Sequence, residues 1–309
     1  MMARVSTSTR GFALVVLAAL CWGTSGVAGD AVLRSSDLDP LDVAWHRMAI
    51  GAVVLVGLHL ARRRPLGTRG SVGRLVLVGA GLAIYQSAYF LAVGTAGVSI
   101  ATLVALGAAP LLIAVGGTLL GHGRPDRATV VALAVALVGL VLLVGVSADA
   151  GGRSVVLGAL TALGCAVAYA AVVLTSSRVP AGVPTTTVGF AVGALLLTPV
   201  ALAAGLDLTA DPLALGLLLY LGAVPTALAY GLFFTGVRTV PAAVVSIVTL
   251  LEPLAATALA TGLLGERLAP TALVGGLLML GAVAGLYLRR MGDSNSRGLA
   301  PNPLSKRAP

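Results

Sequence analysis

The sequence predicts an all-α membrane protein with ten transmembrane helices that form two inverted five-helix repeats. Three observations lead to this fold class: the composition, a series of long apolar segments and an internal repeat. Of the 309 residues, 58% are hydrophobic and 10% are charged, whereas a soluble domain carries about a quarter charged residues. The 40 glycines allow helices to pack closely inside a bilayer. This composition excludes an ordinary soluble domain.

A helix that spans the bilayer needs about 20 apolar residues. The first segment that meets this requirement follows Arg4 and Arg10, but it is too long for the apolar region of a signal peptide. At the other end of the chain, the polar segment 291–309 is expected to be a disordered cytoplasmic tail. In chain order, the ten expected helices cover 11–33, 41–61, 73–93, 97–120, 127–146, 154–176, 184–204, 213–236, 240–263 and 270–289.

Basic residues concentrate in alternate loops, and this sets the expected orientation. Of the 20 Lys and Arg residues, Arg47 lies inside a helix, and Arg34, Arg153 and Arg267 lie in the loops of one side. All the others fall on the opposite side. Because cytoplasmic loops carry the excess of positive charge, we expect both termini in the cytoplasm and the protein in the cell inner (cytoplasmic) membrane. The net charge of +9 then requires no nucleic-acid partner.

The expected external loops lean acidic. Their carboxylates belong to Asp37, Asp39, Asp42, Asp149, Asp207 and Asp211. Two interpretations fit this pattern: a mouth that attracts cations, or acidic residues tolerated where basic ones are excluded.

An internal repeat relates the two halves of the chain. Residues 92–110 align without a gap on 235–253, so that the proline ending each segment coincides. The halves, 11–145 and 154–288, each hold five expected helices. Because five is odd, the second half must enter the membrane with opposite polarity. Inverted repeats are typical of secondary transporters, whose substrate site lies near the bilayer midplane between the halves.

Several short motifs follow the order and spacing of a known family. They are Cys21-Trp22-Gly23-Thr24, Arg47, Tyr230, Arg238-Thr239-Val240-Pro241, Glu252-Pro253 and Gly265-Glu266-Arg267-Leu268. On these residues the chain resembles the EamA family of the drug/metabolite transporter superfamily, over both halves. The resemblance implies a ten-helix carrier with a central cavity that moves small metabolites or drugs, usually outward. The first half departs from the pattern, because Ala109 stands where Glu252 would have its counterpart.

Glu252 lies in the middle of the apolar segment 240–263, directly before Pro253. A charged side chain at the centre of a bilayer costs about 2.5–3.5 kcal/mol on insertion scales. We therefore expect Glu252 to face a cavity, to be protonated or to pair with Arg47. Two interpretations stay open: a proton or substrate-amine site that switches with the access state, and a permanently paired glutamate that holds the helix at the proline.

Other candidates carry polar groups on otherwise apolar helices. Such groups suit a cavity for an amphipathic solute, and hydrogen bonding between helices is the alternative. Pro110 and Pro253 are the expected helix breaks, because breaks at matching positions of two repeats mark the binding region of a transporter; passive kinks are the alternative. The substrate-cavity candidates are Trp22, Arg47, Tyr85, Gln86, Tyr89, Tyr169, Tyr230 and Glu252.

The sequence contains no Walker A, GxSxG, HExxH or Rossmann motif. Cys21 and Cys165 lie in apolar runs without the spacing of metal ligands. We therefore expect no enzyme, no metal and no cofactor.

The predicted function is a secondary transporter that exports amino acids, related metabolites or drugs by alternating access through a central cavity. Its expected partners are a small-molecule substrate and the lipid bilayer. The alternatives are a channel and a non-transporting membrane protein, either a scaffold or a membrane-embedded enzyme. A GxxxG pattern at Gly281 and Gly285 leaves a homodimer open.

Overall fold

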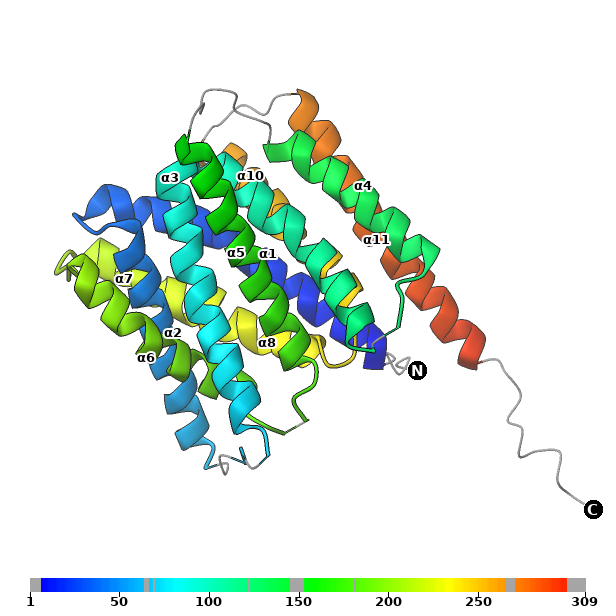
Figure 1. Ribbon diagram of the computed structural model, residues 1–309, viewed down its shortest axis with the longest axis horizontal. Coiled ribbons are helices and arrows are strands. Elements are labelled where there is room, and N and C mark those ends of the chain that lie inside the picture. The colour runs from blue at the N-terminus through cyan, green and yellow to red at the C-terminus, as the bar shows by residue number, and fades with distance from the viewer. Residues whose placement is uncertain are drawn as a thin grey trace, which may run out of the picture.

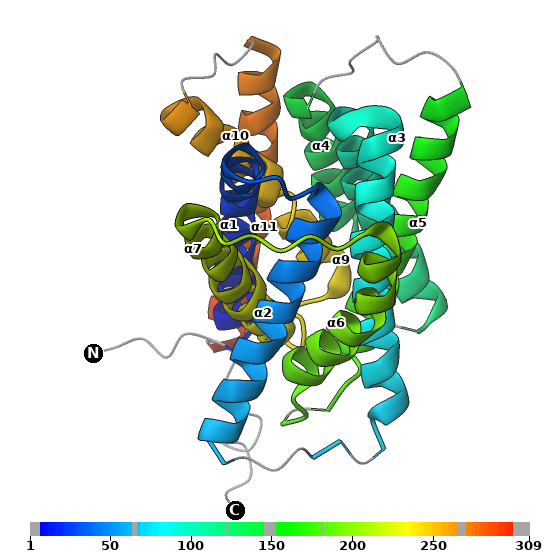
Figure 2. The same ribbon diagram turned by 90° about the vertical axis from the view of Figure 1, so that its left-hand side faces the viewer.

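The computed structural model describes residues 7–63, 67–68, 70–121, 123–144, 153–180, 182–264 and 270–298. Every regular element in these ranges is helical (Figures 1 and 2). The elements are α1 (Thr7–Ser35), α2 (Pro40–Ala61), α3 (Val72–Leu119), α4 (Arg127–Val144), α5 (Arg153–Ser176), α6 (Thr185–Ala204), α7 (Pro212–Leu221), the π-helical segment η1 (Gly222–Leu228), α8 (Ala229–Gly236), α9 (Ala242–Val248), α10 (Leu251–Leu264) and α11 (Pro270–Gly298).

Each of the ten expected segments falls on one or more of these helices. Within the described ranges, seven helices are long and apolar enough to cross a membrane: Thr9–Ser35, Pro40–Ala61, Val156–Ser176, Thr185–Ala204, Pro212–Gly236, Ala242–Leu259 and Pro270–Arg289. Two apolar helices in these ranges are shorter, Val104–Leu119 and Arg127–Leu143.

Helix α3 combines two segments that the sequence predicts as separate helices, 73–93 and 97–120. A straight helix of its 48 residues would be about 72 Å long, whereas the hydrocarbon core of a bilayer is roughly 30 Å thick. The ribbon instead turns back on itself near the middle of α3 (Figures 1 and 2). Arg74 near its start and Leu120 just after its end consequently line the same groove. The two expected spans are the two legs of this helical hairpin.

The span Pro212–Gly236 is interrupted at Pro225, and the sequence explains how. Proline lacks the N–H that would bond to the carbonyl four residues earlier, and its ring crowds that carbonyl. Here the backbone widens into the π-helical segment η1 around Pro225. The hydroxyl of Thr226 donates to the carbonyl of Leu221 at 2.8 Å, so the acceptor freed by the proline has a partner.

The two ends of the bundle carry opposite charges. At one end, Asp39 and Asp42 form a capping box at the start of α2, and Asp42 also accepts a hydrogen bond from the backbone N–H of Asp207. Beneath these residues a buried apolar cluster joins α1, α2 and α7, through side chains such as Val32 and Leu218. We call this the acidic end.

Arginines gather at the opposite end, which we call the arginine end. The side chains of Arg124 and Arg238 line one cavity there, and Arg74 and Arg178 line a neighbouring groove. Arg289 of α11 pairs with Asp126 next to the cavity. The segregation of charge that the sequence predicts along the bundle axis is therefore present in the fold.

Contacts between the two halves of the chain dominate the packing. Helix α1 packs against α8 and α10, both legs of α3 contact the second half mainly through α5 and α6, and α2 packs against α6 and η1. Helix α4 pairs with α11 along one edge of the molecule (Figure 1). Each half therefore depends on the other for the burial of its apolar faces.

The pair α4–α11 approaches closely through glycine. A Cβ atom added at Gly139 would lie 2.6 Å from the carbonyl oxygen of Gly275, and one added at Gly275 would lie 2.5 Å from that of Gly139. Only glycine permits backbones to approach this closely. Gly281 and Gly285 of the GxxxG pattern have open space at their Cβ positions.

Helix α11 extends to Gly298, into the segment 291–309 that the sequence predicts as disordered. Each further residue of an existing helix adds one backbone hydrogen bond without a new nucleation cost, which allows the helix to continue beyond its apolar part. Residues 299–309 of the expected tail, and the Gly265–Leu268 motif, lie outside the described residues.

Candidate functional site

A row of aromatic rings crosses the middle of the bundle. The rings of Trp22 in α1 and Tyr230 in α8 have centroids 4.8 Å apart, and those of Tyr85 in α3 and Tyr169 in α5 are 5.5 Å apart. Phe233 connects the two pairs, at 5.2 Å from Trp22 and 6.4 Å from Tyr169. Four of the candidate residues thus form one aromatic cluster that spans both halves.

Phe233, which connects the two candidate pairs, was not predicted from the sequence. Neither were Phe190 and Phe234, whose rings contact Tyr230. Phe233 is fully buried and contacts Trp22, Tyr169 and Tyr230. A search for polar groups on apolar helices passes over phenylalanine, which has none. The signal was its position three residues after Tyr230, because residues at that spacing share a helix face.

The indole N–H of Trp22 is buried and has no hydrogen-bond partner among the described residues. Buried tryptophan usually finds a partner for this group, and an unsatisfied buried donor costs about 1–3 kcal/mol. Trp45, in contrast, donates its indole N–H to the hydroxyl of Thr198 at 3.0 Å. Trp22 therefore presents a donor that a bound molecule could satisfy.

Glu252 lies where the expected helix 240–263 is interrupted. Helix α9 ends at Val248 and α10 begins at Leu251. Pro253 has no N–H to donate to the carbonyl of Thr249, and the N–H of Glu252 donates to it at 3.0 Å. Glu252 consequently sits in the first turn of α10, where the partial positive charge of a helix N-terminus favours a carboxylate.

Arg47 and Glu252 act on each other electrostatically without direct contact. The carboxyl group of Glu252 is within electrostatic range of the guanidinium of Arg47 and of Tyr230. Among the described residues, no ion pair within 4.0 Å joins Glu252 to Arg47. Arg47 instead donates through Nε to the hydroxyl of Thr226 at 3.3 Å. The two charges therefore bracket a common region from α2 and α10.

The remaining candidates are placed differently. Gln86 is buried, and Tyr89 is half-buried in a separate apolar cluster with Ala162 and Cys165. Pro110 is buried inside α3, and the helix continues through it. The side chains of Tyr169 and Thr249 lie close enough to interact, which brings the aromatic cluster near the break between α9 and α10.

A cavity of about 620 Å³ opens at the arginine end, between α3, α4, α5 and the α8–α9 hinge. None of the eight substrate-cavity candidates lines it. Its lining includes the buried side chains of Ile113 of α3 and Val244 of α9, and Val244 is about two helical turns before Glu252. The lining also includes Arg124, Asp126, Thr129, Ser177 and Arg238.

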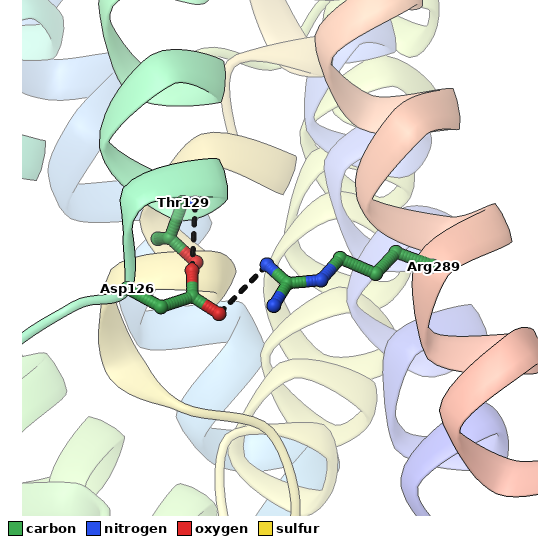
Figure 3. Close-up of polar contacts among 3 residues, drawn as sticks. All are labelled: Asp126, Thr129 and Arg289. Atoms are coloured by element: carbon green, nitrogen blue, oxygen red, sulfur yellow. Dashed lines mark hydrogen bonds and ion pairs between the residues drawn. The ribbon is translucent and has the colours of Figure 1, made fainter. Parts of the chain in front are cut away.

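The polar rim of this cavity is held by specific contacts. Asp126 accepts from the backbone N–H of Thr129 at 2.8 Å and pairs with Arg289 at 2.7 Å (Figure 3). The hydrogen bonds from Thr129 and the charge of Arg289 hold the pKa of the Asp126 carboxyl below its usual value. Both partners of this ion pair are about half exposed, and exposed pairs contribute little to stability.

Arg238 is half-buried in the wall of the cavity. Its Nη2 donates to the carbonyl of Val183 at 3.1 Å and to the hydroxyl of Thr185 at 2.9 Å. Its Nε is buried without a partner among the described residues, and burial lowers the pKa of the guanidinium. From the sequence, Arg124 entered only the argument on orientation and Arg238 that argument and the family motif, because a basic loop residue carries no sign that it lines a cavity.

No group of three or more His, Cys, Asp or Glu side chains that could hold a metal ion occurs among the described residues. The site combines aromatic faces, one carboxylate, one guanidinium and one free indole N–H. Such a set can bind and release a small amphipathic molecule.

Comparison with known proteins agrees with this class, a polytopic helical membrane protein. The sequence model of the EamA-like transporter family matches residues 9–145 and 156–288. The chain belongs to this family, and it is a multi-pass membrane transporter.

Two relatives carry transporter names. The "Uncharacterized transporter YwfM" of Bacillus subtilis (strain 168) is 33% identical over 272 residues, which are 86% of this chain and 90% of that protein. The "Uncharacterized inner membrane transporter YicL" of Salmonella typhimurium is 24% identical over 306 residues, or 96% of this chain and all of that protein. A solved crystal structure shares the fold, with a TM-score of 0.79 at 24% identity, over 94% of this chain and 99% of that chain.

Proposed function

We propose that the protein is a secondary transporter that exports small amphipathic molecules, such as amino acids, related metabolites or drugs, by alternating access through a central site. The observation that carries this proposal is the difference between the two ends of the bundle. An apolar cluster of α1, α2 and α7 closes the acidic end. The arginine end has a cavity of about 620 Å³ that stops short of Glu252. A carrier open on one side has this form.

The packing supports two inverted repeats. Consider the exchange of α1 with α5, of α2 with α6, of the α3 legs with α7–α8 and α9–α10, and of α4 with α11. This exchange maps the contacts of α1 onto those between α3 and α5. The same exchange maps the pairs α2–α6 and α4–α11 onto themselves. It also relates the ring pair Trp22–Tyr230 to Tyr169–Tyr85. Rocking of one half against the other is the motion that such symmetry permits.

The chemistry of the site favours a substrate with an amine and an apolar body. Aromatic faces attract cations and bury apolar surface, and Glu252 supplies the negative charge. Arg47 and the indole N–H of Trp22 provide donors for a carboxylate or carbonyl on the same molecule. An amphipathic zwitterion uses all four groups, and an amine without a carboxylate uses the aromatic faces and Glu252.

The positive-inside rule places the arginine end in the cytoplasm. The cavity of about 620 Å³ then faces the cytoplasm, and a substrate enters from there for transport outward. In this arrangement the protein lies in the cytoplasmic membrane, and both termini are on its cytoplasmic side.

Counterflow in proteoliposomes tests the proposal. Purified protein is first screened for compounds that raise its melting temperature, with amines and amino acids included. Vesicles loaded with any hit should then take up the labelled compound transiently, and the initial rate should saturate with concentration.

The alternatives predict other results. Flux that rises linearly with concentration indicates a channel. A compound that stabilises the protein but is never exchanged, in vesicles shown to be sealed, indicates a non-transporting protein and overturns the proposal.

A further inference from the structure

A second concavity lies on the membrane-facing side of the bundle, apart from the proposed substrate path. It is a groove of about 520 Å³ between the two legs of α3 and helix α5. Among the described residues that line it there is no acidic side chain. The lining consists of Arg74, Leu77, Leu112, Leu120, Val167, Ala170, Ala171, Leu174, Thr175 and Arg178.

The apolar part of the groove suits a hydrocarbon chain. Leu77, Leu120 and Val167 are 45–52% exposed along its walls, and Ala170 and Leu174 are buried beneath them. Along α5 the groove reaches from Val167 to Arg178, a distance of about 16 Å at the helical rise. One leaflet of the bilayer core is about 15 Å deep. The groove therefore matches an acyl chain of a single leaflet.

The other end of the groove is basic. Arg74 lies in the first turn of α3, where the helix dipole already favours anions. Arg178 follows the end of α5, and its Nη2 donates to the carbonyl of Leu120, which holds the guanidinium at the mouth of the groove. Arginine binds phosphate through paired N–H donors, and basic pockets between transmembrane helices bind anionic lipid head groups.

We propose that this groove binds one anionic phospholipid, with its phosphate between Arg74 and Arg178 and an acyl chain along α5. The bound lipid contacts α3 of the first half and α5 of the second half. It is a site distinct from the cavity of Arg124 and Arg238, and the proposal does not depend on the identity of the transported molecule.

Native mass spectrometry of the full chain in detergent tests this site. Dioleoyl phosphatidylglycerol and dioleoyl phosphatidylcholine are added separately, so that only the head group differs. The first should be retained about fivefold better, as expected for one additional charge interaction near a membrane surface. Equal retention of the two lipids overturns the proposal.

Variants locate the site. Arg74→Gln should reduce retention of phosphatidylglycerol about fivefold, and Ala171→Phe should reduce it by filling the groove. Arg62→Gln is the matched control, because Arg62 caps α2 at the same end and does not line the groove. Arg178 is left intact because it also bonds to α3. If Ala171→Phe does not fold, Arg74→Gln alone decides the question. The site is overturned if Arg74→Gln reduces the retention of phosphatidylglycerol no more than Arg62→Gln does.

Discussion

Trp22 and Trp45 are the two tryptophans of the chain, and they differ in one property. The indole N–H of Trp45 has a partner in Thr198, whereas that of Trp22 has none among the described residues. A buried donor without a hydrogen-bond partner destabilises the folded protein unless a bound molecule accepts its hydrogen bond. The natural interpretation is that Trp22 keeps its N–H for a ligand and Trp45 uses its own for the fold.

Replacement of each tryptophan by phenylalanine separates these roles. Trp22→Phe should raise the KM of transport about two- to tenfold, the equivalent of one neutral hydrogen bond, and cost no hydrogen bond within the protein. Trp45→Phe should lower the melting temperature and leave KM unchanged, because it leaves Thr198 without its donor. Transport kinetics and thermal unfolding of both variants measure the effects. An unchanged KM in Trp22→Phe contradicts the assignment.

Glu252 is the second residue whose role can be isolated. If its carboxyl group carries protons between the two sides, Glu252→Gln should make efflux in vesicles insensitive to an imposed pH gradient, at wild-type expression. Asp126→Asn is the control, because it also removes one carboxylate but at the exposed rim. Gradient dependence that survives in Glu252→Gln, or that the wild type lacks, rules out proton coupling through this residue.

At the scale of the helices, proline and glycine have determined the interruptions and the closest contacts. Pro225 widens one span into η1, and Pro253 accompanies the break between α9 and α10. Gly139 and Gly275 allow α4 and α11 to meet backbone to backbone. Each effect follows from the loss of an N–H or the lack of a Cβ atom.

The α4–α11 contact predicts opposite effects for two similar substitutions in α11. Gly275→Ala should destabilise the protein by about 1–3 kcal/mol, because its methyl group has no room against the Gly139 carbonyl. Gly281→Ala should be neutral or stabilising by up to about 1 kcal/mol, since its Cβ meets open space and alanine favours helix. Unfolding in detergent measures both. Similar effects of the two substitutions would contradict the observed packing.

Hydropathy predicted where the helices lie, because bilayer thickness sets the length of each apolar run. It could not predict that the legs of α3 form one helical segment, because hydropathy reports where apolar runs lie and not whether the helix ends between them. No proline lies between 93 and 97 to end the helix. Their polar groups on otherwise apolar helices also identified Trp22, Tyr85, Tyr169 and Tyr230 as candidates. That these rings form one cluster through Phe233 depends on contacts between helices far apart in the sequence, and no local pattern encodes those contacts.

At the scale of the whole molecule, the cavity and the closed end predict an accessibility pattern. In a variant with Cys21 and Cys165 replaced by alanine, Ser177→Cys in the cavity should react with a membrane-impermeant maleimide added from the cytoplasmic side. Leu208→Cys, at a position 77% exposed beside the acidic end, should react from the other side. Labelling of inverted and right-side-out vesicles measures this. The reversed pattern would reject the proposed orientation.

The separation of arginines and aspartates to opposite ends has a further consequence for a population of these molecules. A copy that turned over in the bilayer would have to carry Arg74, Arg124, Arg178 and Arg238 through the hydrocarbon, at about 2.5–3.5 kcal/mol for each charge at the centre. This barrier suppresses flip-flop, so each copy keeps the orientation in which it was inserted. If insertion follows the proposed positive-inside orientation, all copies point the same way, and their individual cycles add up to a vectorial current of solute instead of cancelling.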